Sequence, residues 1–112
     1  MKKVTVVIRP GKLEEAKEAL VEAGVKGMTV CQVLGCGQQL GWTKEYKGTE
    51  YTVNLKPQVK IEIVVREEAV DQIIGAVTKA VRTGEIGDGK IFVTPVENAI
   101  RVRTGETGDS AV

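Results

Sequence analysis

Two stretches of the chain alternate apolar and polar residues, and each is followed by apolar residues at helical spacing. The first alternation covers residues 4–8 and ends at Pro10, and the helical spacing then runs over residues 12–24. The second alternation covers residues 59–65, and the helical spacing that follows it runs over residues 67–84. A period of two is typical of a half-buried strand, and a period near 3.6 is typical of an amphipathic helix. The sequence therefore predicts two strand–helix units.

Two further strands complete the pattern. Residues 28–34 favour a strand, which we expect to end at the glycines on either side of Cys36. Residues 91–93 form the last main strand, after a glycine-rich turn over residues 82–90. The order strand, helix, strand, strand, helix, strand is that of the ferredoxin-like α+β fold, βαββαβ, with both helices on one sheet face. The other face is left open, and oligomerisation is its natural cover, although the fold by itself defines no activity.

The remaining segments have no clear period. Residues 37–55 are rich in Gln, Gly, Lys and Glu, so we expect a long mobile loop there; loops of this length are usually functional or disordered. This loop is predicted to carry recognition, with Trp42 as either a partner contact or local packing. Tyr46 and Tyr51 are either exposed modification targets or packed at the base of the loop. In the C-terminal segment 100–112, we expect a short extended piece and then a polar tail without fixed structure.

Composition excludes several classes of protein. The chain of 112 residues is one domain, 1–112, and its 16 Lys and Arg against 15 Asp and Glu give a net charge of +1. This balance lacks the basic excess of a general nucleic-acid binder, and 4% aromatic residues offer no stacking platform for RNA. The absence of histidine argues against triad hydrolases and His-ligated zinc enzymes. The chain has no long apolar run of the kind that predicts membrane insertion, so we expect a soluble, cytoplasmic protein.

Two cysteines, Cys31 and Cys36, lie in or next to the second predicted strand. On one extended strand their Cα atoms would be roughly 16 Å apart, far beyond the reach of a disulfide. Two free thiols suit a reducing cytoplasm. No histidine or further cysteine completes a metal set, so we expect both to be small buried or half-buried residues.

Two segments have the composition of phosphate-binding elements. Residues 83–90 place closely spaced glycines before Lys90, which lets backbone N–H groups and an ammonium approach phosphates. They are not a Walker loop, because Ile91 follows the lysine. Arg101 and Arg103 would project from one face of an extended chain about 6.6 Å apart, a spacing that suits a polyphosphate. A plain helix-to-strand turn and a solvated basic edge are the alternative interpretations.

The chain resembles the PII signal-transduction proteins. The stretches that carry the resemblance are YKGTEY at residues 46–51, TGEIGDGKIFV at 83–93 and IRVRTGE at 100–106. The resemblance implies a homotrimer of ferredoxin-like subunits that binds ATP or ADP in clefts between neighbours. It also implies a regulator that has no substrate turnover.

The resemblance assigns roles to individual residues. The phosphates would be held by Gly87, Asp88, Gly89 and Lys90, joined by Arg101 and Arg103 of the adjoining subunit. The adenine and ribose would lie near Thr29, Glu62 and Val64. The base of the long loop would be formed by Gly35, Gly37, Gln38 and Gln39, with the Gln39 side chain helping to hold Mg²⁺ when ATP and 2-oxoglutarate bind together.

The long loop, residues 37–55, would be the partner-binding element. In the family this loop contacts ammonium transporters and nitrogen-metabolism enzymes, so the protein would associate with the membrane through a transporter and insert nothing into it. Tyr51 matches the tyrosine that a uridylyltransferase modifies in many bacteria. Thr49 lies where some relatives carry a phosphorylated serine.

The sequence departs from the family pattern at the base of this loop. Gln58 replaces a lysine whose ammonium pairs with a carboxylate of 2-oxoglutarate, and a neutral amide cannot supply that charge. Lys56 lies on the same side of an extended segment, roughly 6.6 Å away. Gln38 replaces an arginine, and Cys36 replaces an apolar aromatic residue. One alternative is therefore a divergent member that senses adenylate state or another small anion without 2-oxoglutarate. A small ferredoxin-fold phosphatase or ATPase is a further alternative, for which no general base stands out.

Overall fold

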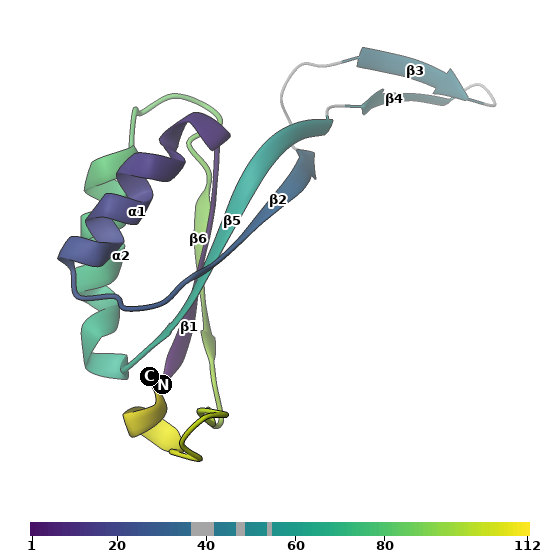
Figure 1. Ribbon diagram of the computed structural model, residues 1–112. Coiled ribbons are helices and arrows are strands. Elements are labelled where there is room, and N and C mark those ends of the chain that lie inside the picture. The colour runs from purple at the N-terminus through teal and green to yellow at the C-terminus, as the bar shows by residue number, and fades with distance from the viewer. Residues whose placement is uncertain (37–41, 47–48, 54) are drawn as a thin grey trace.

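The computed structural model describes residues 1–36, 42–46, 49–53 and 55–112, and for residues 42–46 and 49–53 it describes the backbone alone. The two strand–helix units that the periods predict are present, β1 with α1 and β5 with α2 (Figure 1). The strands and α-helices are β1 (Lys2–Ile8), α1 (Leu13–Glu22), β2 (Thr29–Cys36), β3 (Trp42–Tyr46), β4 (Thr49–Val53), β5 (Leu55–Val65), α2 (Val70–Val81) and β6 (Lys90–Pro95). Short 3-10 turns at Pro10–Lys12 and Glu67–Ala69 lead into the two helices, and a third covers Gly108–Ala111.

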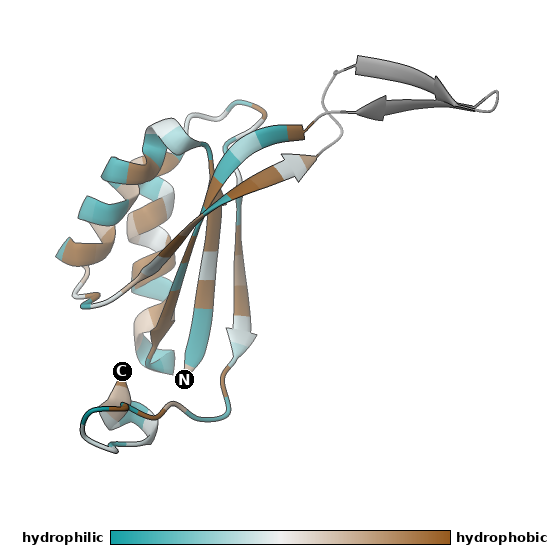
Figure 2. Cartoon of the chain, turned by 45° about the vertical axis from the view of Figure 1, so that its right-hand side comes forward, coloured by the Kyte–Doolittle hydropathy of each residue, from teal (hydrophilic) through white to brown (hydrophobic). Residues whose placement is uncertain are grey.

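The main sheet is antiparallel with strand order β2-β5-β1-β6, and both helices cover one of its faces (Figures 1 and 2). The alternating residues of β1 and β5 meet in register, with Val4 opposite Ile63 and Val6 opposite Ile61. Their side chains are buried against the apolar stripes of the helices, which include Leu20 of α1. The predicted ferredoxin-like α+β fold is confirmed.

The second sheet face is uncovered in the single chain. Phe92, on the edge strand β6, is 50% exposed, and it lies in register with Thr5 of β1, which in turn lies opposite Glu62 of β5. The central strands carry polar and charged residues on this side, as the alternation of β1 and β5 requires. The prediction of an open face is therefore confirmed.

Strands β2 and β5 are longer than predicted. Gly35 was expected to end the second strand, yet it lies inside β2 opposite Lys56, and β5 begins at Leu55, before Pro57. Proline is tolerated where its missing N–H faces no partner strand. Because β1 pairs with β5 only from Val59 onward, Pro57 has a partner strand on one side only, that of β2.

The segment expected to be a loop contains a two-stranded sheet. Strands β3 and β4 pair antiparallel, with Trp42 opposite Val53 and Tyr46 opposite Thr49. They form a sheet separate from the main one. The long loop predicted over residues 37–55 thus contains a hairpin, which the sequence did not indicate because these strands carry no apolar alternation from which pairing could be recognised.

The C-terminal segment was also predicted incorrectly. Residues 102–104 form a turn where an extended piece was expected, and an isolated bridge joins Ile100 to Thr107. The tail is also ordered. Gly108 N donates to Ala99 O at 3.0 Å, and Arg66 Nη2 donates to Asp109 O at 3.4 Å. Hydrogen bonds outside the core, which hydrophobic periodicity does not report, hold both features.

Candidate functional site

The glycine-rich loop lies between the end of α2 and the start of β6 and rests on the end of β1. Gly84, Gly87 and Gly89 have positive φ values of 86°, 99° and 107°, which glycine adopts without strain. Gly89 lies so close to β1 that a Cβ atom on it would be 2.0 Å from the carbonyl oxygen of Val7. Glycine is therefore required there for both conformation and space.

This loop has the donors of an anion site. Among the described residues, the backbone N–H groups of Ile86, Gly87, Asp88 and Gly89 donate to no protein group. Runs of unpaired amides in turns with alternating φ signs form concavities that bind anions. Lys90 follows directly, opposite Val7 and exposed. The loop can therefore offer amides and an ammonium to a phosphate.

The carboxylate of Asp88 holds the loop together. It accepts hydrogen bonds from the N–H groups of Thr83 and Gly84, each at 2.8 Å, from the Thr83 hydroxyl, and from Arg9 Nη2 at 3.1 Å. The bond from the Thr83 hydroxyl is the largest of the causes that lower the pKa of Asp88 from 3.8 to about 2. Asp88 is therefore ionised at neutral pH, and its carboxylate binds groups of its own loop.

Arg9 is a residue of this site that the sequence did not indicate. It follows β1 and reaches the loop across 78 positions of sequence, where its Nε donates to Gly87 O at 3.2 Å. Its Nη2 also lies 3.4 Å from Ile86 O. No local motif joins residues this far apart, so no pattern in the sequence could have linked Arg9 to the loop.

A cavity of about 310 Å³ lies beneath the loop on the helix side of the sheet. Its lining is mostly apolar and comprises Ile8, Ile74, Thr78, Val81, Arg82, Asp88, Gly89, Lys90 and Ile91. It is partly open to solvent. Although Lys90 belongs to this lining, its side chain lies on the opposite face of the sheet, because Lys90 is in register with Val7.

The residues predicted to contact the base and ribose lie on the open sheet face. Thr29 is directly opposite Glu62, and Val64 lies opposite Lys3 of β1. Glu62 pairs with Lys3 Nζ at 3.1 Å and with Lys60 Nζ at 3.3 Å. Hydrogen bonds from these two lysines, Lys3 first, lower the pKa of Glu62. The structure thus brings Thr29 and Glu62 together and makes Glu62 an ionised acceptor.

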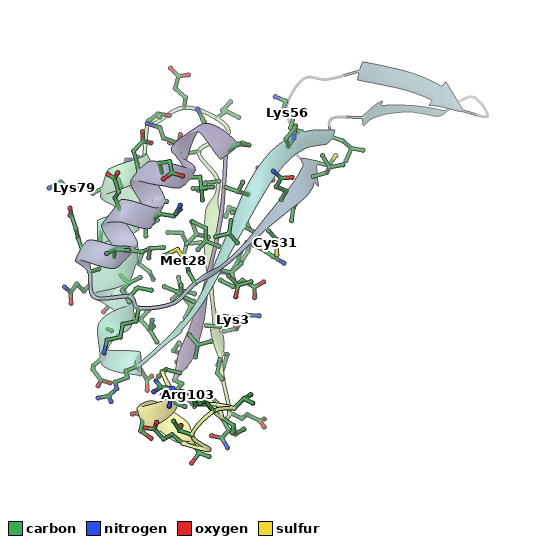
Figure 3. The ribbon with its side chains drawn as sticks, viewed as in Figure 1. Lys3, Met28, Cys31, Lys56, Lys79 and Arg103 are labelled. Carbon is green, nitrogen blue, oxygen red and sulfur yellow. The ribbon has the colours of Figure 1, made fainter. Side chains whose placement is uncertain are left out.

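The two predicted arginines do not reach the loop of their own chain. They were expected to share one face of an extended piece, but Arg101 and Arg103 lie at a tight turn. Arg101 N donates to Glu106 O at 2.8 Å, and its guanidinium pairs with Glu106 at 3.4 Å. This turn follows the far end of β6, whose length of about 17 Å separates it from the glycine-rich loop (Figure 3).

At the base of the long loop, Gln58 lies against Gly35. A Cβ atom on Gly35 would come within 1.9 Å of Gln58 Oε1, so the Gln58 amide occupies the space that glycine leaves open. Lys56 lies opposite Gly35 in the register. The predicted residues Gly37, Gln38 and Gln39 lie outside the described residues, and so do the side chains of Trp42, Tyr46, Thr49 and Tyr51.

Both cysteines are exposed, so the prediction of burial was wrong. They lie on β2, which is an edge strand of the sheet in the described part of the chain; Cys31 lies opposite Lys60 (Figure 3), and Cys36 lies opposite Leu55, beyond the end of β1. Both are free thiols on one strand, as the spacing predicts. Within the ranges that the structure describes, no group of His, Cys, Asp and Glu could hold a metal ion. No helix in those ranges is long and apolar enough to span a bilayer.

The fold and the loop together define a ferredoxin-like α+β domain with a candidate anion site at the edge of its sheet. A family model described as Nitrogen regulatory protein P-II matches residues 1–106. Proteins of that name from Rhodobacter capsulatus and Microchaete diplosiphon are 56% and 54% identical to the chain, with 100% of both chains covered in each case. Nitrogen regulatory protein P-II 2 from Methanothermobacter thermautotrophicus is 52% identical over 100% of this chain and 97% of its own.

The chain therefore belongs to the nitrogen regulatory protein P-II family, which the sequence motifs predicted. Its relatives are named as regulatory proteins, which places this chain among regulators and not among enzymes.

Proposed function

We propose that the protein binds ATP or ADP between neighbouring copies of the chain and signals the nucleotide state to partner proteins through residues 37–55. The observation that carries this proposal is the separation of two cationic elements along β6. The loop ending in Lys90 precedes this strand, and the turn with Arg101 and Arg103 follows it. A nucleotide that uses both elements must take the arginines from a second chain, and a closed homotrimer provides this for every copy.

The donor set fits a nucleotide. Unpaired loop amides and Lys90 suit the phosphates, and charge-assisted bonds of this kind are stronger than neutral ones. Thr29, Glu62 and Val64, on the open face, provide polar and apolar contacts for the ribose and the base. Mg²⁺ would accompany ATP and offset its charge. Its proposed ligand, Gln39, lies outside the described residues.

The partners follow from the family. Relatives are named nitrogen regulatory proteins, so we place the targets among nitrogen-metabolism enzymes or an ammonium transporter, reached through residues 37–55 in the cytoplasm. Tyr51 is the proposed site of uridylylation by a uridylyltransferase, and Thr49 is a second candidate for modification.

A second candidate function is sensing of adenylate state alone, and Gln58 favours it. Gln58 replaces the lysine that, in the family, pairs with 2-oxoglutarate, and its neutral amide lies against Gly35. Catalysis by the same site as a phosphatase or ATPase is not supported. The carboxylates of Asp88 and Glu62 both have lowered pKa values, and a carboxylate with a lowered pKa is a weak general base.

Calorimetric titration tests the proposal. ATP with Mg²⁺ and ADP are each titrated into the protein, and 2-oxoglutarate is then titrated in the presence of each nucleotide. We expect both nucleotides to bind a trimer, as measured by sedimentation. Binding of 2-oxoglutarate only with Mg²⁺ and ATP supports the full carbon and nitrogen sensor, and its absence supports the adenylate sensor. A monomer that binds neither nucleotide would overturn both.

A further inference from the structure

We propose that Arg9 and Thr83 are positioning residues of the glycine-rich loop, which hold Asp88 inward and orient the loop amides toward a phosphate. This inference rests on the proposed function and changes the role of Asp88 within it. A carboxylate among phosphate ligands repels an anion unless its charge is compensated. The structure shows which groups compensate it.

The lone pairs of Asp88 are fully used inside the loop. Oδ2 accepts from the N–H groups of Thr83 and Gly84, and Oδ1 accepts from the Thr83 hydroxyl and from Arg9 Nη2. An ionised carboxylate has about four lone-pair sites, so these four donors saturate it. The side chain is only 23% exposed. Asp88 therefore has no free lone pair for a metal ion and acts through the loop that it organises.

Arg9 fixes the direction of two peptide planes. Its Nε donates to Gly87 O, and its Nη2 reaches Ile86 O at 3.4 Å. In a planar trans peptide the C=O and the following N–H point in opposite directions. Because Arg9 holds the carbonyls of Ile86 and Gly87, the N–H groups of Gly87 and Asp88 must point away from it. These two N–H groups are among the unpaired amides of the loop.

Thr83 closes the first half of the loop. Its hydroxyl donates to Asp88 and accepts from Glu85 N at 3.2 Å, so one side chain links both sides of the turn. Serine can make both contacts, whereas valine has a similar shape and can make neither. The pair Thr83→Ser and Thr83→Val therefore separates hydrogen bonding from packing.

The binding test compares Arg9→Gln, Arg9→Lys, Thr83→Val and Thr83→Ser by calorimetry with ADP and with inorganic tripolyphosphate. We expect Arg9→Gln and Thr83→Val to lower the affinity for both ligands about tenfold. The affinities of Thr83→Ser should stay within about twofold of those of the parent protein. Arg9→Lys keeps the charge and loses the fork that reaches two carbonyls, so it should weaken binding as Arg9→Gln does. Lys17→Gln, which removes an exposed cation paired with Glu14 on α1, is the matched control and should bind normally.

A readout without nucleotide separates this inference from the proposed function. Hydrogen exchange at the amides of Thr83 and Gly84, which donate to Asp88, should accelerate in Thr83→Val and Arg9→Gln and stay slow in Thr83→Ser. Failure of the parent protein to bind ATP would overturn the proposed function, and the exchange rates would still test the network. Unchanged exchange in both disruptive variants would overturn the inference.

The variant Asp88→Asn distinguishes positioning from metal binding. A positioning carboxylate predicts the same loss of ATP affinity with and without Mg²⁺. A loss confined to the Mg²⁺ titration would show that Asp88 is a metal ligand and would overturn the inference.

Discussion

Gly89 combines a left-handed backbone with a close approach to Val7, so replacing it costs stability twice. We expect Gly89→Ala to lower the free energy of unfolding by about 2–5 kcal/mol, from backbone strain and from overlap with the Val7 carbonyl. Gly84 has a φ of 86° and no atom within 4 Å of an added Cβ, so Gly84→Ala should cost only about 1–2 kcal/mol. Urea unfolding measures both, and equal losses would contradict the close approach.

The lowered pKa of Asp88 predicts a dependence of stability on pH. A carboxyl whose pKa is lower in the folded state stabilises the fold fully above its unfolded pKa, and this contribution is lost as the pH falls toward the folded pKa. The window for Asp88 thus extends from its ordinary value of 3.8 down to about 2. The free energy of unfolding should fall through this window, and less steeply in Asp88→Asn.

Urea unfolding at a series of pH values checks this expectation. Glu62 also has a lowered pKa, so Asp88→Asn should keep part of the slope. Glu18→Gln, on the exposed side of α1, is the control and should reproduce the parent slope. A slope in Asp88→Asn as steep as that of the parent would contradict the role given to the carboxylate.

At the scale of elements, adjacent residues of α1 give a direct test of which face packs on the sheet. Leu20 is fully buried in the core, whereas Val21 is 62% exposed. We expect Leu20→Ala to lower the free energy of unfolding by about 2–5 kcal/mol, because it leaves a cavity. Val21→Ala should change it by less than about 0.5 kcal/mol. Thermal or urea unfolding measures both, and similar losses would mean that the helix is rotated.

The elements that face the core were predictable, and those held by hydrogen bonds outside the core were not. A strand that is buried on one face has apolar residues at every second position, as at Val59, Ile61 and Ile63. This alternation also indicates which side chains of the strand face the core. Strand β2 continues through Gly35 because β5 pairs with it there, and no local sequence pattern indicates this pairing. The turn after Arg101 depends on backbone bonds to Glu106 and likewise has no side-chain period.

The candidate site divides in the same way. Closely spaced glycines before Lys90 are visible in the sequence because conformational freedom and charge are properties of single residues. The ion pair of Arg9 with Asp88 is a property of the folded topology, which brings the end of β1 against the loop before β6. A sequence pattern could therefore locate the loop and could not identify what holds it.

At the scale of the whole molecule, the two cationic elements on either side of β6 predict complementation between damaged chains. We expect Lys90→Gln chains and Arg101→Gln/Arg103→Gln chains each to lose ADP binding. Refolding them together at equal amounts should restore about a quarter of the sites, because each site then draws one element from each chain at random. Calorimetry on the co-refolded protein measures the recovered fraction, and mixing without refolding is the control. If no ADP binding is recovered, both cationic elements of a site must come from the same chain.

The two ends of the chain lie next to each other, at the end of the sheet away from the glycine-rich loop (Figures 1 and 2). A hydrogen bond from Val96 N to Met1 O at 3.2 Å ties the strand that leads to the C-terminal segment to the first residue. An affinity tag on either terminus would therefore lie beside the turn that carries Arg101 and Arg103. A polyhistidine tag would also add imidazole groups to a chain that contains no histidine. Purified protein should be freed of its tag before any nucleotide is titrated into it.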